Sequence, residues 1–106
     1  MLKLSADSIK NRDVWEQAGI TLPEFDYECM VSKTNENPTW IHFGAGNIFR
    51  GFLAVLQQEL LNKKHVETGI IAVETYDYEI IDRIYAPFDN LSLLVTMHPD
   101  GKFDKR

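Results

Sequence analysis

The segment of residues 39–51 constrains the fold most, because an apolar run passes directly into a glycine turn and then into a long stretch with helical spacing. Residues 39–43 are mostly β-branched or aromatic, which is typical of a strand that is buried on both faces. Gly44 and Gly46 lack a Cβ, so the backbone there can bend tightly and another molecule can approach it closely. The sequence therefore predicts a buried strand, an open turn and a helix in direct succession.

The stretch after the turn has the pattern of an amphipathic helix over residues 48–64. Its apolar side chains recur at intervals of three and four and would form one face against a sheet: Phe49, Phe52, Leu53, Leu56 and Leu60. Its polar side chains would face water: Arg50, Gln57, Gln58, Lys63 and Lys64. Residues 69–73 then form a short apolar run, which predicts a parallel strand covered on both sides. A strand–helix–strand unit of this kind is right-handed.

The predicted start of this helix is suited to an anion. Backbone N–H groups without intrahelical partners point outward there, at the positive end of the helix dipole. Together with the preceding strand, this layout favours the pyrophosphate of a dinucleotide. We expect it to be held by Gly44, Ala45, Gly46, Asn47 and Ile48. The alternative is that the glycines belong to an ordinary turn.

Glu74 ends the second apolar run, close to where an acid accepts hydrogen bonds from the ribose hydroxyls of such a ligand. No cation lies among residues 74–79 to meet a 2′-phosphate, so the sequence favours NAD over NADP. The alternative for Glu74 is a solvated carboxylate at a strand end. Asp77 is the competing acid, but it precedes apolar residues at helical spacing and is more simply a helix N-cap.

Two further side chains lie close to the expected phosphate position. Arg50 falls in the first helical turn and would neutralise pyrophosphate charge directly or through water, or else belongs to the solvent face of the helix. His42 lies within the first strand and is expected to be a hydrogen-bonded core histidine rather than a metal ligand.

Three segments together resemble the amino-terminal part of the mannitol dehydrogenase family of long-chain polyol and sugar-acid dehydrogenases: residues 40–52, 69–76 and 89–96. The turn of that family, Gly-x-Gly followed by an aromatic residue and an arginine, matches Gly44, Gly46, Phe49 and Arg50. The resemblance implies reversible hydride transfer between NAD and a secondary alcohol of an open-chain sugar or sugar acid. It also implies a catalytic lysine in a later helical domain, and no residue here matches that lysine. Because Phe49 replaces the third glycine of the general fingerprint, we expect the helix to stand further from the sheet.

The expected fold class is α/β, and residues 39–106 form the first half of a Rossmann-type dinucleotide-binding domain. A complete domain needs two such halves in a sheet of about six strands, for which the chain is too short. We expect about three parallel strands with crossover helices. They include a short helix at about residues 77–85, ended by Pro87, and a third strand at residues 91–97. The turn chemistry of residues 98–101 predicts the start of a β-hairpin, and the substrate domain is absent.

Residues 1–38 are predicted to form an amino-terminal arm that packs on this half-domain. Ser5 and Asn11 can each cap a helix, and Gly19 suits its end. Residues 23–38 are polar and are expected to form a loop. The alternative for the whole arm is a partly disordered leader.

The first strand would lie at the centre of a complete sheet, so here it should have a free edge. Apolar Trp40, Ile41 and Phe43 would be exposed on it, and the strand would invite another chain. We therefore expect self-association through this edge or through exposed helix faces.

The composition excludes several other functions. The net charge of -5 argues against binding to nucleic acid. No apolar run approaches ~18 residues and no signal-like leader is present, so no membrane partner or export is expected. Cys29 is the single cysteine, which excludes an internal disulfide and fits the cytoplasm. His42, His65 and His98 share no ligand spacing with Cys29, so no metal is expected.

Two rival functions stay open at this point. A methyltransferase also uses a glycine turn after its first strand and an acid after its second, with S-adenosylmethionine in place of NAD. Its turn usually holds more glycine than residues 44–49 offer. The other rival is a non-catalytic module that binds a nucleotide or a partner.

Overall fold

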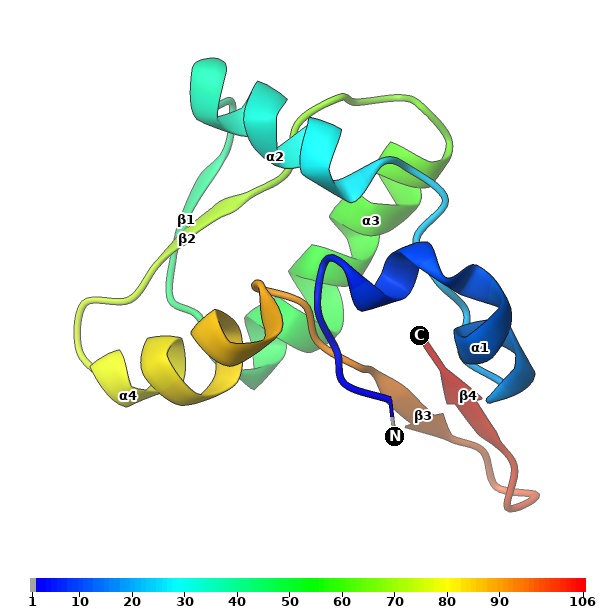
Figure 1. Cartoon of the computed structure of the whole chain (residues 1–106). Coiled ribbons are helices and arrows are strands. Elements are labelled where there is room, and N and C mark those ends of the chain that lie inside the picture. The colour runs from blue at the N-terminus through cyan, green and yellow to red at the C-terminus, as the bar shows by residue number, and fades with distance from the viewer. Residues whose placement is uncertain (1) are drawn as a thin grey trace.

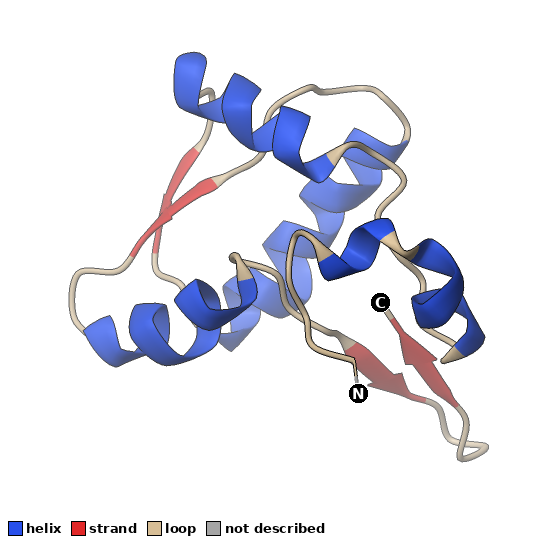
Figure 2. Ribbon diagram, viewed as in Figure 1, coloured by secondary structure: helices blue, strands red, loops and turns tan. Residues whose placement is uncertain are grey.

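The computed structural model describes residues 2–106, so residue 1 of the expected arm lies outside the described part. Within that part, the chain forms two small sheets together with helices (Figure 1). Strands β1 (Ile41–Phe43) and β2 (Ile71–Val73) pair in parallel, and β3 (Val95–Met97) and β4 (Phe103–Lys105) pair antiparallel. Figure 2 shows the two sheets apart from each other, with helical segments between them. The expected α/β class is therefore confirmed.

The strand–helix–strand unit predicted from the sequence is present. Ile41 pairs with Ile71 and Phe43 with Val73, and the Gly44 N–H continues the ladder by donating to the Val73 carbonyl at 2.7 Å. The connection is helical from Asn47 onward. It consists of a wide π-helical turn, η2 (Phe49–Leu53), followed by α3 (Ala54–Asn62).

The expectation that the first strand is buried on both faces is wrong for this chain. The side chains of Ile41 and Phe43 are 54% and 72% exposed. These two side chains share one face of β1, and the strand has a partner on one edge only, namely β2. The free edge predicted for this strand is therefore present, and the face that carries Ile41 and Phe43 is bare, whereas Trp40 is half-buried and the opposite face is covered because His42 packs against Phe49.

The prediction that Gln57 lies on the solvent-facing side of the long helix is wrong. Gln57 is 6% exposed, and its side chain donates to the Thr68 carbonyl at 2.7 Å. The cause is the π-helical turn at the helix start. An i→i+5 turn contains one residue more than a regular helical turn. Beyond this turn, each buried position therefore lies one residue later than the regular helical spacing predicts. The buried positions accordingly move from Leu56 to Gln57 and from Leu60 to Leu61.

The third parallel strand expected at residues 91–97 is also wrong. Helix α4 (Tyr78–Ile80) continues through η3 (Ile81–Tyr85) and η4 (Ala86–Phe88), with Pro87 in its last turn rather than beyond its end. Asp89 and Asn90 then take positive φ and turn the chain away from β2. The apolar run that follows pairs through Leu94 with Arg106 and leads into the β3–β4 hairpin. The hairpin turn at residues 98–101 is confirmed, with Gly101 at φ +86°.

The amino-terminal segment is more helical than expected. It contains η1 (Ser8–Lys10), α1 (Arg12–Gln17) and α2 (Tyr27–Glu36). The loop predicted over residues 23–38 is therefore wrong, because the Asp26 side chain caps α2 by accepting the Cys29 N–H at 3.1 Å. Gly19 ends the first helical segment at φ +79°, as its position predicted.

The segment also packs on both sheets. The Thr34 hydroxyl accepts the Gly69 N–H just before β2 at 2.8 Å, and the Thr21 N–H donates to the Lys105 carbonyl on β4 at 2.8 Å. These two contacts hold residues from the first third of the chain against the middle and the end of the remainder.

Candidate functional site: the glycine turn after β1

The turn after β1 needs its two glycines for different reasons. Gly44 has φ +112°, a backbone conformation that side chains with a Cβ rarely adopt. Gly46 has an ordinary φ, but a Cβ placed on it would meet no atom within 4 Å. Gly44 therefore sets the shape of the bend, while Gly46 leaves open space beside the backbone.

The helix that follows begins with unpaired donors. The Arg50 N–H makes the first helical bond, to the Gly46 carbonyl at 3.1 Å. The N–H groups of Gly46, Asn47 and Ile48 find no acceptor among residues 2–106, as is normal for a first helical turn. Because Asn47 and Ile48 are exposed, these amides offer hydrogen bonds to an anion at the place that the sequence predicted.

Glu74 follows β2 directly and reaches this turn. Its Oε2 accepts the Ala45 N–H at 3.2 Å, and its Oε1 accepts the N–H groups of Tyr76 at 3.1 Å and Asp77 at 3.3 Å. The backbone bond from Tyr76, followed by those from Ala45 and Asp77, lowers the pKa of Glu74 below its ordinary value of 4.5. Glu74 is thus a charged carboxylate held by three backbone amides, one of which belongs to the glycine turn.

Asp77 takes the N-cap position of α4, but its side chain makes no capping hydrogen bond. Its backbone N–H is instead one of the groups that hold Glu74. Of the two candidate acids, Glu74 is therefore the one that contacts the turn.

Arg50 turns back toward the glycine turn instead of joining the solvent face of the helix. Its Nη1 donates to the Ala45 carbonyl at 2.8 Å, and its Nη2 donates to the Asn47 side-chain oxygen. The guanidinium carbon lies 5.7 Å from the centre of the Tyr85 ring, within cation–π range. Its charge lies beside the candidate phosphate site while its donors bind the turn itself.

Tyr85 is the site residue that the sequence reasoning missed. It comes from η3, is 7% exposed, and its hydroxyl donates to the Ala45 carbonyl at 2.8 Å. The available signal was its position four residues after Ile81, on the apolar side of a short helix. That pattern predicts burial, but it does not indicate which backbone group a buried hydroxyl would contact.

His42 and Phe49 fill the space between β1 and the helix. The His42 Nδ1 lies 3.0 Å from the Gly44 oxygen, and the two ring centres are 5.0 Å apart. Phe49 is 8% exposed. The expected hydrogen-bonded histidine is confirmed, and a large ring occupies the place where the general fingerprint has glycine.

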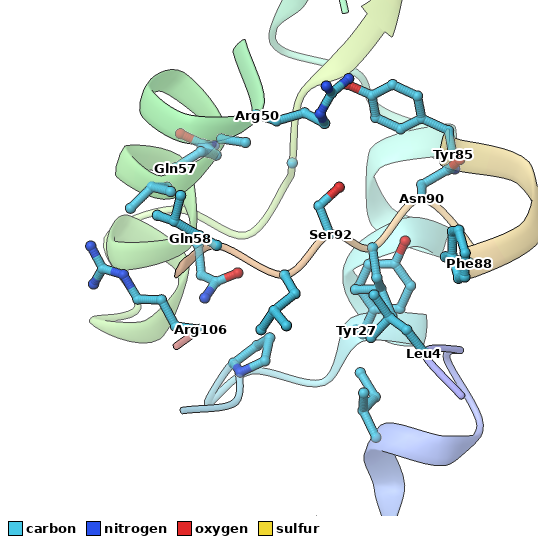
Figure 3. A pocket seen from close by; sticks show the side chains of 18 of the residues that line it. Leu4, Tyr27, Arg50, Gln57, Gln58, Tyr85, Phe88, Asn90, Ser92 and Arg106 are labelled. Atoms are coloured by element: carbon cyan, nitrogen blue, oxygen red, sulfur yellow. The ribbon is translucent and has the colours of Figure 1, made fainter. Parts of the chain in front are cut away.

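A cavity of about 1200 Å³ adjoins the turn on the inner side of the helix (Figure 3). It lies among α3, β2, the amino-terminal segment and residues 88–94. It touches the site through Asn47, Phe49, Arg50 and Tyr85, and its lining includes neither Gly44, Gly46 nor Glu74. Figure 3 shows Arg50 and Tyr85 directed toward one another at one end of it. The cavity is therefore separate from the open space at the glycine turn, and the two adjoin at these shared residues.

Residues 2–106 contain neither a metal-binding cluster nor a membrane-spanning helix. No three His, Cys, Asp or Glu side chains in this part gather where a metal ion would be held. None of the helices in the same part combines the length and apolar character needed to cross a membrane.

The fold and the site together define an α/β chain in which a glycine turn joins a parallel strand to a helix and meets an acid from the neighbouring strand. The chain is 49% identical over 105 residues to the D-mannonate oxidoreductase of Thermotoga maritima. The match covers 99% of this chain but 20% of the relative, so the chain spans about one fifth of that protein's length. The resemblance to sugar-acid dehydrogenases is therefore confirmed. No protein-family model matches the chain, and no solved structure matches it.

Proposed function

We propose that this chain is the cofactor-binding part of an NAD-dependent oxidoreductase that interconverts a sugar acid of the D-mannonate type and its keto form. The single observation that carries the proposal is the sequence identity of 49% to a D-mannonate oxidoreductase over 105 residues, a span that includes the β1–turn–β2 unit. The first half of a Rossmann-type domain, over residues 39–106, is the fold that this proposal requires.

The residues around the turn fit a dinucleotide. A Cβ on Gly46 would meet no atom within 4 Å, so this backbone is open to a ligand, and the free amides of Gly46, Asn47 and Ile48 are the donors that a pyrophosphate needs. Glu74 lies at the end of β2, where its carboxylate accepts from ribose hydroxyls. NAD supplies the hydride acceptor for oxidation of the alcohol when it is bound.

The same residues favour NAD over NADP. A 2′-phosphate would face the charged carboxylate of Glu74, and residues 74–79 offer no cation to offset it. Arg50 contributes positive charge close to the turn, because its guanidinium donates to the Ala45 carbonyl and to the Asn47 side chain. The charge distribution therefore suits a ligand with phosphates at the turn and hydroxyls at Glu74.

The catalytic base is assigned to no residue of this chain. We propose that the base belongs to a part of the enzyme that corresponds to the unmatched four fifths of the relative. We therefore expect cofactor binding without turnover from this polypeptide alone. The free and exposed Cys29 fits a reducing compartment, and we place the enzyme in the cytoplasm.

The proposal is tested by titrating the chain with NADH, NADPH and S-adenosylmethionine in parallel by calorimetry. We expect NADH to bind and NADPH to bind more weakly. Binding of S-adenosylmethionine in preference to NADH would indicate the methyltransferase alternative. Failure of all three to bind would leave a non-catalytic module as the function of this chain.

A further inference from the structure

Ala45 is held from both sides although it carries no functional side chain. It has no exposed surface, its N–H donates to Glu74, and its carbonyl accepts from both Tyr85 and Arg50 at 2.8 Å. Two donors on one carbonyl, one of them charged, hold a backbone group more firmly than an ordinary turn does. The peptide group that follows Ala45 is therefore fixed in orientation.

That peptide group also contains the Gly46 N–H. The described chain has no cis peptide bond, so the Ala45 carbonyl and the Gly46 N–H point in opposite directions across one plane. Tyr85 and Arg50 bind the carbonyl on the inner side, where both residues line the cavity. The Gly46 N–H consequently points outward, and it has no acceptor among residues 2–106.

Tyr85 is suited to this task by its own surroundings. Burial of its ring raises the pKa of its phenol, so the hydroxyl stays protonated and remains a donor. The ring also lies against the Arg50 guanidinium, which orders the second donor. One tyrosine thus places both hydrogen bonds on the Ala45 carbonyl.

We propose that Tyr85 is a positioning residue for the cofactor, which acts through the Ala45–Gly46 peptide to aim the Gly46 N–H at the pyrophosphate. The inference rests on the proposed function. Hydrogen bonds at the carbonyl also polarise the peptide, which makes its N–H a better donor. Tyr85 touches no part of the bound dinucleotide in this arrangement.

The test is a ¹⁵N NMR titration of the chain with NADH, comparing wild type with Tyr85→Phe and with Tyr78→Phe. Tyr78 is the matched control, because it carries the same hydroxyl in the same segment but is 65% exposed. For Tyr85→Phe we expect a displaced Gly46 amide peak and a loss of NADH affinity of about 3- to 10-fold, the scale of one hydrogen bond. Tyr78→Phe should match wild type in both respects. Adenosine lacks the pyrophosphate, so its affinity should change less than that of NADH.

A folded Tyr85→Phe protein with an unmoved Gly46 peak and wild-type NADH affinity would overturn the inference. If Tyr85→Phe does not fold, Arg50→Lys takes its place, since it keeps the charge but loses the planar fork of donors. The same peak should then shift. If wild type itself fails to bind NADH, the proposed function is overturned. The Gly46 peak position in the two variants still decides whether Tyr85 fixes the orientation of the Ala45–Gly46 peptide.

Discussion

The carboxylate of Glu74 accepts the backbone N–H of Ala45 at 3.2 Å, across 29 positions of the sequence. The contact exists because β1 and β2 are parallel neighbours, so that their carboxyl ends meet at one edge of the sheet. It joins the acid and the glycine turn into one site.

The first prediction concerns acid stability. Hydrogen bonds in the folded chain lower the pKa of Glu74 below 4.5, so its charged form stabilises the fold above that pH and this contribution is lost as the pH falls through the lowered value. Glu74→Gln should therefore lose less stability than wild type on acidification below about 4.5, as measured by urea unfolding at a series of pH values. Glu79→Gln is the control, because Glu79 is exposed. Identical acid profiles for wild type and Glu74→Gln would contradict the assigned contacts.

The second prediction separates the two glycines of the turn. Gly44→Ala should destabilise the fold by about 1–3 kcal/mol, because alanine is strained at φ +112°. Gly46→Ala has room for its Cβ and should keep its stability, yet it should weaken NADH binding by filling the space beside the backbone. Urea midpoints and NADH titrations of both variants check this division. Equal loss of stability in the two variants would refute it.

The third prediction tests how α2 is attached to the sheet. Thr34→Val removes the acceptor of the Gly69 N–H, which is buried, and should cost about 1–3 kcal/mol of unfolding free energy. Thr39→Val is the matched control, because its hydroxyl contacts only the Thr68 hydroxyl at an exposed position. Chemical unfolding of the two variants provides the measurement. A Thr34→Val protein as stable as Thr39→Val would show that α2 is not held in this way.

The fourth prediction concerns an exposed apolar stripe that recurs every four residues along the helix after the turn. Its members are Ile48, Phe52, Leu56 and Leu60, at 78%, 57%, 43% and 38% exposure. Together with the free edge of β1, this stripe should make the chain self-associate. Sedimentation velocity should show concentration-dependent association that Phe52→Glu reduces. Met97→Glu is the control and should not reduce it, because Met97 is an apolar residue on β3 that is 74% exposed and lies outside the stripe. A monomer at every concentration would contradict the expectation.

The elements around the turn were predictable because their signals are local. The strand, the glycines, the helix start and Glu74 each follow from neighbouring residues, and parallel pairing then brings Glu74 to Ala45. The sequence resemblance pointed to the same segment. The sequence pattern therefore indicated Glu74 and Arg50, two of the residues whose side chains contact the turn in the structure.

The remaining features depend on geometry that the pattern does not carry. A single wide helical turn moved the buried face from Leu56 to Gln57. Capping by Asp26 stabilised a helix in a polar segment, and two residues with positive φ turned the expected third strand into a hairpin. Tyr85 was missed because its partner is a backbone carbonyl 40 positions away.

The central claim is that the glycine turn and Glu74 form one NAD site, and NADH titration of wild type, Glu74→Ala and Glu79→Ala tests it most directly. Loss of hydrogen bonds to a charged group should weaken NADH binding in Glu74→Ala by about 1–3 kcal/mol, or about 5- to 150-fold. Glu79→Ala removes an exposed carboxylate outside the site and should bind NADH like wild type. An unchanged NADH affinity in a folded Glu74→Ala protein would contradict the account.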